Sequence, residues 1–284
     1  MSRIRIIWLL FGIVVVAVVL RSYQLTARSI WFDESFTYRL ISFPVSELIN
    51  RTAADVHPPL YYILVKYWTV VFGASALALR SFSVLCAALT VLGGYFFTAE
   101  AFRSRRAGIT AAIFLAVSPW TIAYAWEARM YTLGMTFALF SSFVLLRALR
   151  KRSLGWFLLY GVLAAAFFYT HYYAIFTIVA QIAALLAVFI WQTKARVGEI
   201  IQDRSFWWAI CGYMLALLLI SPWIPRFLVQ QSQVQESYWV PRIGLVSVPD
   251  TLYRLFIPTI NLPERHGIMA GVLLLPLVIT IIVW

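Results

Sequence analysis

Long apolar segments alternate with short polar ones along most of the chain. Eight of these segments approach the ~20 residues that a helix needs to cross a ~30 Å hydrocarbon core. They lie at 6–22, 80–99, 107–123, 131–148, 154–170, 173–191, 207–222 and 268–284. The pattern predicts an all-α polytopic membrane protein with about eight transmembrane helices. We expect Arg21, at the end of the first segment, to extend its side chain to the interface.

The long connection 23–79 is only partly apolar. Its apolar residues recur at helical spacing up to Pro44 and again after it, which predicts two short helices with their apolar faces on the membrane surface. The run 58–73 is interrupted by Lys66, and the roughly 14 apolar residues are too few to span comfortably. We therefore expect 58–73 to lie at the interface or to re-enter.

Basic residues decide the predicted topology. The connections 1–5, 100–106, 147–153 and 192–206 contain more than half of the 23 Lys and Arg residues and few of the 11 acids. Connections on the cytoplasmic side carry such an excess of Lys and Arg. We therefore expect a cytoplasmic N-terminus, because a spanning 58–73 would turn the basic clusters outward.

Composition supports a membrane protein and limits other classes. Apolar residues make up 63% of the 284 positions, only 12% are charged, and the mean hydropathy is +0.85. Most of the net charge of +12 lies in the connections predicted to be cytoplasmic, so we expect no nucleic-acid partner. Cys86 and Cys211 lie in separate apolar segments, where packing is a better explanation than a disulfide or a metal site.

This topology places the outer connections 23–79, 124–130, 171–173 and 223–266 on one face. The first contains adjacent acids, Asp33 and Glu34, between aromatic residues at a membrane edge. An ionised carboxylate there could accept a proton from a hydroxyl, which makes the pair a candidate catalytic base. Asp is also a favoured helix N-cap, so Asp33 could cap the first interfacial helix instead of, or as well as, acting as a base.

Further polar residues of this face could contact a substrate. His57 could donate a hydrogen bond to a phosphate or hydroxyl, or be a solvated loop histidine, and Arg80 could bind a phosphate or extend to the interface. Glu127 and Arg129 lie between two spans, either as an ion pair or facing a polar cavity. His171 is similarly placed.

The sequence contains no ligand cluster typical of a dedicated metal site. Its three histidines are far apart, so no His-based site is predicted, although acids such as Asp33 or Glu127 could hold a divalent cation. It also lacks the glycine-rich motifs that bind nucleotides. An outer-face site has no ready supply of nucleotide sugars, so a lipid-linked donor is more plausible.

Several short motifs, in this order and spacing, resemble the membrane glycosyltransferases of the C-type fold. The nearest resemblance is to the branch with protein O-mannosyltransferases and the lipid A aminoarabinose transferase, within glycosyltransferase family 39. It covers about residues 1–190 and rests on the segments 33–34, 57–60, 79–81, 102–108, 118–131 and 171–173.

The resemblance implies transfer of a sugar from a polyprenyl phosphate to an acceptor hydroxyl on the non-cytoplasmic face, with inversion. It implies that Asp33 is the general base and that Glu34 assists by hydrogen bonding. It places His57 and Arg80 near the donor phosphate and Glu127 where related enzymes keep a second acid. The acceptor could be a protein, a lipid or a glycan, and the location a bacterial plasma membrane.

The resemblance also implies a longer protein than residues 1–284, which we expect to be a single transmembrane glycosyltransferase module truncated at its C-terminus. Two other classes remain open at this point. A transporter or flippase of lipid-linked sugars would have internal repeats and polar residues at the membrane midplane. An inactive scaffold fragment would keep the fold and lack sugar transfer.

Overall fold

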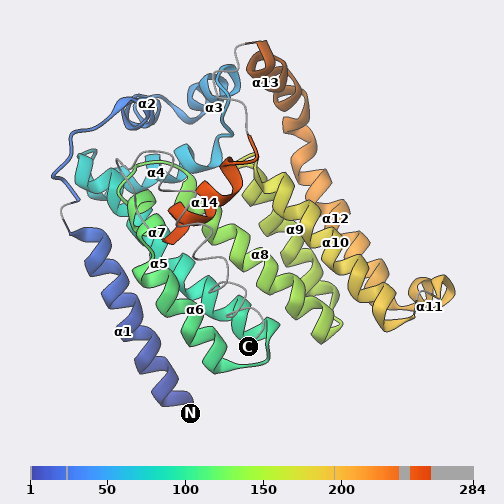
Figure 1. Cartoon of the computed structure of the whole chain (residues 1–284). Helices are drawn as coiled ribbons and strands as arrows, with labels where there is room; N and C mark the ends of the chain where they lie inside the picture. Colours follow the sequence, from blue (N-terminus) through green and yellow to red (C-terminus); the bar gives the residue numbers. More distant parts are fainter. Residues whose placement is uncertain (1, 24, 195, 237–243, 257–284) are drawn as a thin grey trace.

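The computed structural model describes residues 2–23, 25–194, 196–236 and 244–256, which form helices joined by turns (Figure 1). The helices are α1 (Arg3–Ser22), α2 (Phe32–Ile41), α3 (Val45–Ala54), α4 (Leu60–Phe72), α5 (Ala76–Ala101), α6 (Arg105–Val117), α7 (Pro119–Ala125), α8 (Tyr131–Lys151), α9 (Leu154–Phe168), α10 (Ala174–Gln192), α11 (Val197–Gln202), α12 (Arg204–Ile220), η1 (Ser221–Trp223), α13 (Ile224–Glu236) and α14 (Ser247–Phe256).

Five helical segments of the described residues are long and apolar enough to cross a membrane: α1, α5, α8, α10 and Arg204–Val234. The bent pair α6 and α7 gives a sixth if it counts as one span. The expectation of about eight spans is therefore not confirmed. The predicted segment 154–170 forms only the 15-residue α9, because the chain turns at Tyr169, and 268–284 lies outside the described residues.

The four basic connections that were predicted to share one side of the membrane do lie toward the same end of the bundle. The start of α1, the α5–α6 turn, the α8–α9 turn and α11 lie toward one end, away from α2, α3 and α13 (Figure 1). Helix α4 has only 13 residues and packs against α2 and α3 at the same end of the bundle. The 58–73 segment therefore does not cross the bundle, in agreement with the prediction.

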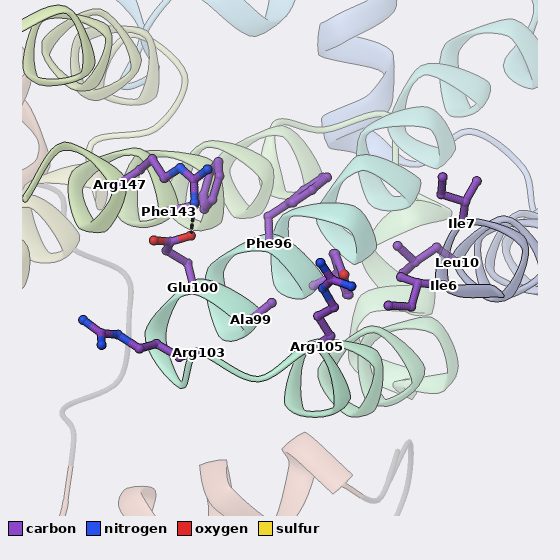
Figure 2. A pocket seen from close by; sticks show the side chains of 11 residues that line it. Ile6, Ile7, Leu10, Phe96, Ala99, Glu100, Arg103, Arg105, Phe143 and Arg147 are labelled. Carbon is purple, nitrogen blue, oxygen red and sulfur yellow. Dashed lines mark hydrogen bonds and ion pairs between the residues drawn. The ribbon is translucent and has the colours of Figure 1, made fainter. Parts of the chain in front are cut away.

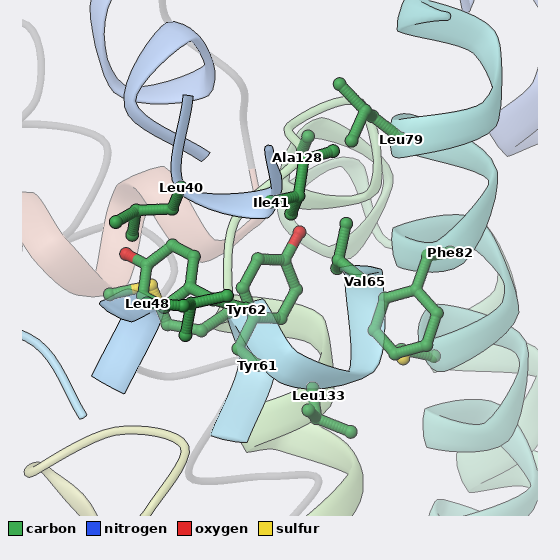
Figure 3. Close-up of a cluster of buried hydrophobic side chains, with 12 residues drawn as sticks. Leu40, Ile41, Leu48, Tyr61, Tyr62, Val65, Leu79, Phe82, Ala128 and Leu133 are labelled. Carbon is green, nitrogen blue, oxygen red and sulfur yellow. The ribbon is translucent and has the colours of Figure 1, made fainter. Parts of the chain in front are cut away.

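The two predicted interfacial helices are present as α2 and α3, but their apolar faces cover protein rather than lipid. Leu40 of α2 and Leu48 of α3 are buried against Tyr61 and Tyr62 of α4 (Figure 3). The same cluster continues to Leu79 of α5. The packed aromatic core gives the candidate site at this end a rigid base.

Helices α9 and α12 approach each other closely at two glycines. A Cβ on Gly161 would lie 2.3 Å from the carbonyl oxygen of Gly212, and one on Gly212 would lie 2.5 Å from that of Phe157. Neither position can carry a side chain without moving the backbones apart. Small residues permit this kind of close contact between membrane helices.

The prediction that Arg21 extends its side chain to the interface is wrong. Its side chain is fully buried, and it donates hydrogen bonds of 2.8 Å to the carbonyl oxygens of Leu115 and Ala116. These carbonyls lie before the break between α6 and α7, where the axis bends by 56°. Pro119 has no N–H to bond with Leu115, and the Arg21 guanidinium and the Thr121 hydroxyl donate to that carbonyl oxygen instead.

Candidate active site

The acid pair lies in the first turn of α2, and its two members face different surroundings. Glu34 is fully buried, and its Oε2 accepts a 3.4 Å hydrogen bond from the N–H of Trp31. Glu34 therefore supplies the helix cap that the sequence suggested for Asp33. The side chain of Asp33 remains 31% exposed.

Glu34 forms a buried ion pair with Arg80. The Nε and Nη2 atoms of Arg80 lie 2.8 and 2.6 Å from the two carboxylate oxygens, and both side chains are at most 3% exposed. Burial alone would raise the pKa of Glu34. The hydrogen bonds from Arg80 and from the N–H of Ala128 outweigh burial and lower that pKa below its usual value, so the carboxylate is ionised.

The remaining N–H groups of Arg80 are also occupied. They donate to the carbonyl oxygens of Leu25, Arg28 and Ser29 at 2.8 to 3.0 Å. A guanidinium has five N–H groups, and here none is left for a phosphate. The four hydrogen bonds that Glu34 accepts likewise leave it no place for an acceptor or a sugar. Both residues are therefore saturated by each other and by backbone groups, although both line the pocket that also contains Glu127. Their contact with substrate stays a prediction.

The buried pair also fixes the loop between α7 and α8. The N–H of Ala128 donates to Glu34 at 2.9 Å, and the carbonyl oxygen of Ala128 accepts a 3.0 Å bond from the Thr37 hydroxyl. Both backbone polar groups of Ala128 are thus hydrogen-bonded to side chains of α2. Its neighbours Glu127 and Arg129 are consequently brought beside Asp33.

Arg129 is the central cation of the site and is only 3% exposed. Its Nη1 donates to the Tyr62 hydroxyl at 3.1 Å, and its Nη2 lies 3.8 Å from Oδ2 of Asp33. Arg129 thus pairs with Asp33 and not with the neighbouring Glu127. Its Nε has no hydrogen-bond partner among the described residues.

His57 links Arg129 to a carboxylate that the sequence reasoning missed. The Nη2 of Arg129 lies 3.0 Å from Nε2 of His57, and Nδ1 of His57 lies 2.8 Å from Oδ2 of Asp55. Because a guanidinium can only donate, Nε2 of His57 accepts this hydrogen bond. Nδ1 therefore carries the ring proton and donates a hydrogen bond to the Asp55 carboxylate. Both ring nitrogens are occupied, so His57 orients Arg129 and has no N–H for a phosphate. The position of Asp55, two residues before His57, was the available signal.

Glu127 is half-buried close to two other acids of the site, Glu34 and Asp33. Burial raises the pKa of Glu127 to about 7, and the negative charges of Glu34 and Asp33 add to this effect. Near neutral pH the carboxyl group is about half protonated. It lines a pocket of about 580 Å³ together with Arg28, Trp126 and the Glu34–Arg80 pair.

The shifted pKa of Glu127 predicts a pH-dependent stability. Between its ordinary value of 4.5 and about 7, the folded protein binds more protons than the unfolded chain. Stability should therefore fall as the pH rises through this window, and Glu127→Gln should remove that contribution. Thermal unfolding in detergent across this pH range tests the predicted fall in stability. Glu47→Gln is the control, because the side chain of Glu47 in α3 is 43% exposed. Equal pH slopes in the wild type and Glu127→Gln would contradict the shift.

His171 occupies the turn between α9 and α10, close to the same cluster. Its ring lies 6.0 Å from that of Tyr131, and its Nδ1 accepts a 3.1 Å hydrogen bond from the N–H of Tyr173. Burial lowers the pKa of His171 to about 4, with the nearby His57 and Arg129 contributing. His171 is therefore a neutral ring that carries its proton on Nε2, and it adds no positive charge.

The structure thus brings Asp33, His57, Glu127, Arg129 and His171 together, and the Glu34–Arg80 pair adjoins Glu127 in its pocket. Within the described ranges, no three His, Cys, Asp or Glu side chains form a group that could hold a metal ion. The arrangement provides one exposed carboxylate, one carboxyl that titrates near neutrality, and a buried cation between them.

Comparison with known proteins identifies the family. The sequence profile of the family described as dolichyl-phosphate-mannose-protein mannosyltransferase matches residues 56–225. This is more than half of the chain, and it includes every predicted site residue except Asp33 and Glu34. No curated protein matches the chain. The multi-pass membrane protein described above therefore belongs to the dolichyl-phosphate-mannose-protein mannosyltransferase family.

Proposed function

We propose that this protein transfers mannose from a polyprenyl phosphate to an acceptor hydroxyl at the α2–α3 end of the bundle, with inversion. Asp33 is the general base. The acceptor is a hydroxyl of a protein, lipid or glycan, and the site faces the non-cytoplasmic side of a bacterial plasma membrane. The family match supports the mannosyltransferase class, and the basic connections support the orientation.

The observation that carries the base assignment is the difference among the three acids. Glu34 accepts four hydrogen bonds and is fully buried. Glu127 has a pKa of about 7, which suits a hydrogen-bond donor to the sugar or acceptor. Asp33 is partly exposed, and the 3.8 Å contact with Arg129 is the one polar contact that its side chain makes with the described residues. It is therefore the carboxylate that an incoming hydroxyl can reach.

The reaction is a single displacement. The acceptor oxygen attacks the anomeric carbon from the side opposite the phosphate, so the new C–O bond forms with inversion as the bond to the phosphate oxygen breaks. The polyprenyl phosphate leaves with the bonding electron pair, and the hydroxyl proton passes to Asp33. Arg129 orients Asp33 during this step, and His57 with Asp55 orients Arg129.

An apolar pocket beside the site has the properties required for the isoprenoid chain of the donor. Its volume is about 500 Å³, and Pro59 and Leu60, which follow His57 closely, form part of its wall. Val162 of α9 and Trp223 of η1 lie on its other sides. A chain in this pocket would be shielded from water and would reach the bilayer between helices.

Arg226 is the cation best placed for the donor phosphate. It lines the apolar pocket, and its guanidinium stands 5.2 Å from the centre of the Trp223 ring. Its side chain forms no ion pair with any described residue, whereas Arg80 and Arg129 are engaged elsewhere. A cation there would stabilise the negative charge that develops on the leaving phosphate.

Donor preference tests the function. The purified protein should transfer labelled mannose from polyprenyl phosphate mannose and not from a nucleotide mannose. Val162→Trp should fill part of the pocket and raise the KM for a long-chain donor about tenfold, which corresponds to ~1.4 kcal/mol of lost binding. The KM for a donor with a very short isoprenoid should change little.

Val179→Trp is the matched control, because Val179 is 57% exposed on α10 and lies outside the pocket. Equal effects of Val162→Trp and the control would reject the pocket assignment. Direct use of nucleotide mannose would reject the lipid donor. Absence of transfer from every donor would favour an inactive scaffold.

A further inference from the structure

A third pocket lies at the opposite end of the bundle, next to the turn between α5 and α6 (Figure 2). Its volume is about 650 Å³, and α1, α5, α6 and α8 contribute to it. The lining residues divide into an apolar group (Ile6, Ile7, Leu10, Tyr95, Phe96, Ala99 and Phe143) and a charged group (Glu100, Arg103, Arg105 and Arg147). Neither the family assignment nor the proposed chemistry uses this pocket.

The charged group has an excess of positive charge. The two carboxylate oxygens of Glu100 accept hydrogen bonds from Arg147 at 2.7 Å and from Arg150 at 3.0 Å. This acid is therefore already paired with two arginines. Arg103 and Arg105 are exposed, and neither forms an ion pair or a hydrogen bond through its side chain with a described residue. Two cations at the rim of one pocket therefore lack an anion.

The apolar group continues onto the lipid-facing surface. Ile7 of α1 is 63% exposed and Phe96 of α5 is 39% exposed, and both belong to helices long enough to span a membrane. A ligand that satisfies the pocket needs an anionic group at the rim and an apolar part along these side chains. A free phosphate would leave the apolar part empty.

We propose that this pocket binds an anionic phospholipid, with its phosphate between Arg103 and Arg105 and one acyl chain along Ile7, Leu10 and Phe96. Guanidinium groups match phosphate oxygens with paired hydrogen bonds. Basic pockets between transmembrane helices are suited to anionic headgroups. The positive-inside topology would place this lipid in the cytoplasmic leaflet.

Native mass spectrometry of the protein taken from vesicles of phosphatidylcholine with phosphatidylglycerol tests the proposal. The wild type should retain phosphatidylglycerol in preference to phosphatidylcholine. The double variant Arg103→Gln/Arg105→Gln should retain about tenfold less of the anionic lipid. Arg106→Gln is the matched control, because Arg106 is exposed on the same turn and does not line the pocket.

Two outcomes would overturn the proposal. An equal loss per removed charge in Arg106→Gln would show general attraction to an anionic surface instead of a defined site. Thermal stabilisation by inorganic phosphate as large as that by phosphatidylglycerol would show a site for a free anion. Sugar transfer is measured separately, so failure here leaves the proposed function untouched.

Discussion

Asp33→Asn should reduce the rate of sugar transfer by about 100- to 10,000-fold, the usual contribution of a general base. The amide has the same shape as the carboxylate and cannot take the proton of the acceptor hydroxyl. Because Asp33 is 31% exposed and makes only one long ion-pair contact, expression and thermal stability should change little. Single-turnover transfer from polyprenyl phosphate mannose is the measurement.

Glu47→Gln is the matched control for Asp33→Asn, because it removes an exposed carboxylate from the neighbouring helix α3. It should transfer sugar at the wild-type rate. A similar loss in both variants would show an effect of surface charge. Near-normal turnover in Asp33→Asn would reject this residue as the base and point to Glu127, the remaining acid of the site that is not saturated.

The largest loss of stability is expected from breaking the buried pair of Glu34 and Arg80. Removing one partner leaves an uncompensated charge in the interior, which costs about 3–5 kcal/mol. Glu34→Ala also removes the acceptor of the backbone N–H groups of Trp31 and Ala128. Arg80→Ala leaves three backbone carbonyl oxygens without this donor. Thermal unfolding in detergent should show a much lower transition for each variant.

The exposed pair of Glu47 and Arg51 provides the comparison. Its atoms are also 2.8 Å apart, but both side chains are 43% exposed, so Glu47→Ala should cost no more than about 1 kcal/mol. Donor-lipid binding separates the two roles considered for Arg80. If Arg80→Ala kept the fold and lost only donor affinity, Arg80 would be a phosphate ligand and the supporting role would be wrong.

The topology was predictable because it depends on properties that each segment carries by itself. Segment hydropathy and the basic connections located most spans and grouped their ends correctly, and helical spacing located α2 and α3. The expected number of spans was not confirmed within the described residues, since 268–284 lies outside them and hydropathy does not register a turn such as the one that ends α9 at Tyr169. Arg21 was misplaced because its partners, the carbonyls before Pro119, are about 95 residues away.

The candidate site shows the same division. The sequence alone selected Asp33, His57, Glu127, Arg129 and His171, which the fold does bring together. It also selected Glu34 and Arg80 for contact with substrate, whereas both are saturated by each other and by backbone groups. Their saturation depends on hydrogen bonds across 46 and more residues, which no local pattern contains.

By itself, the sequence determined that this is a multi-pass membrane protein with a cluster of polar residues on one face, and which family it resembles. Only the tertiary structure showed that the two adjacent acids differ in burial and in their partners. The physical reason is burial: one turn of helix directs Glu34 inward to Arg80 and leaves Asp33 at the surface beside Arg129. Neighbours with the same chemistry thereby receive different charge partners and different exposure to solvent.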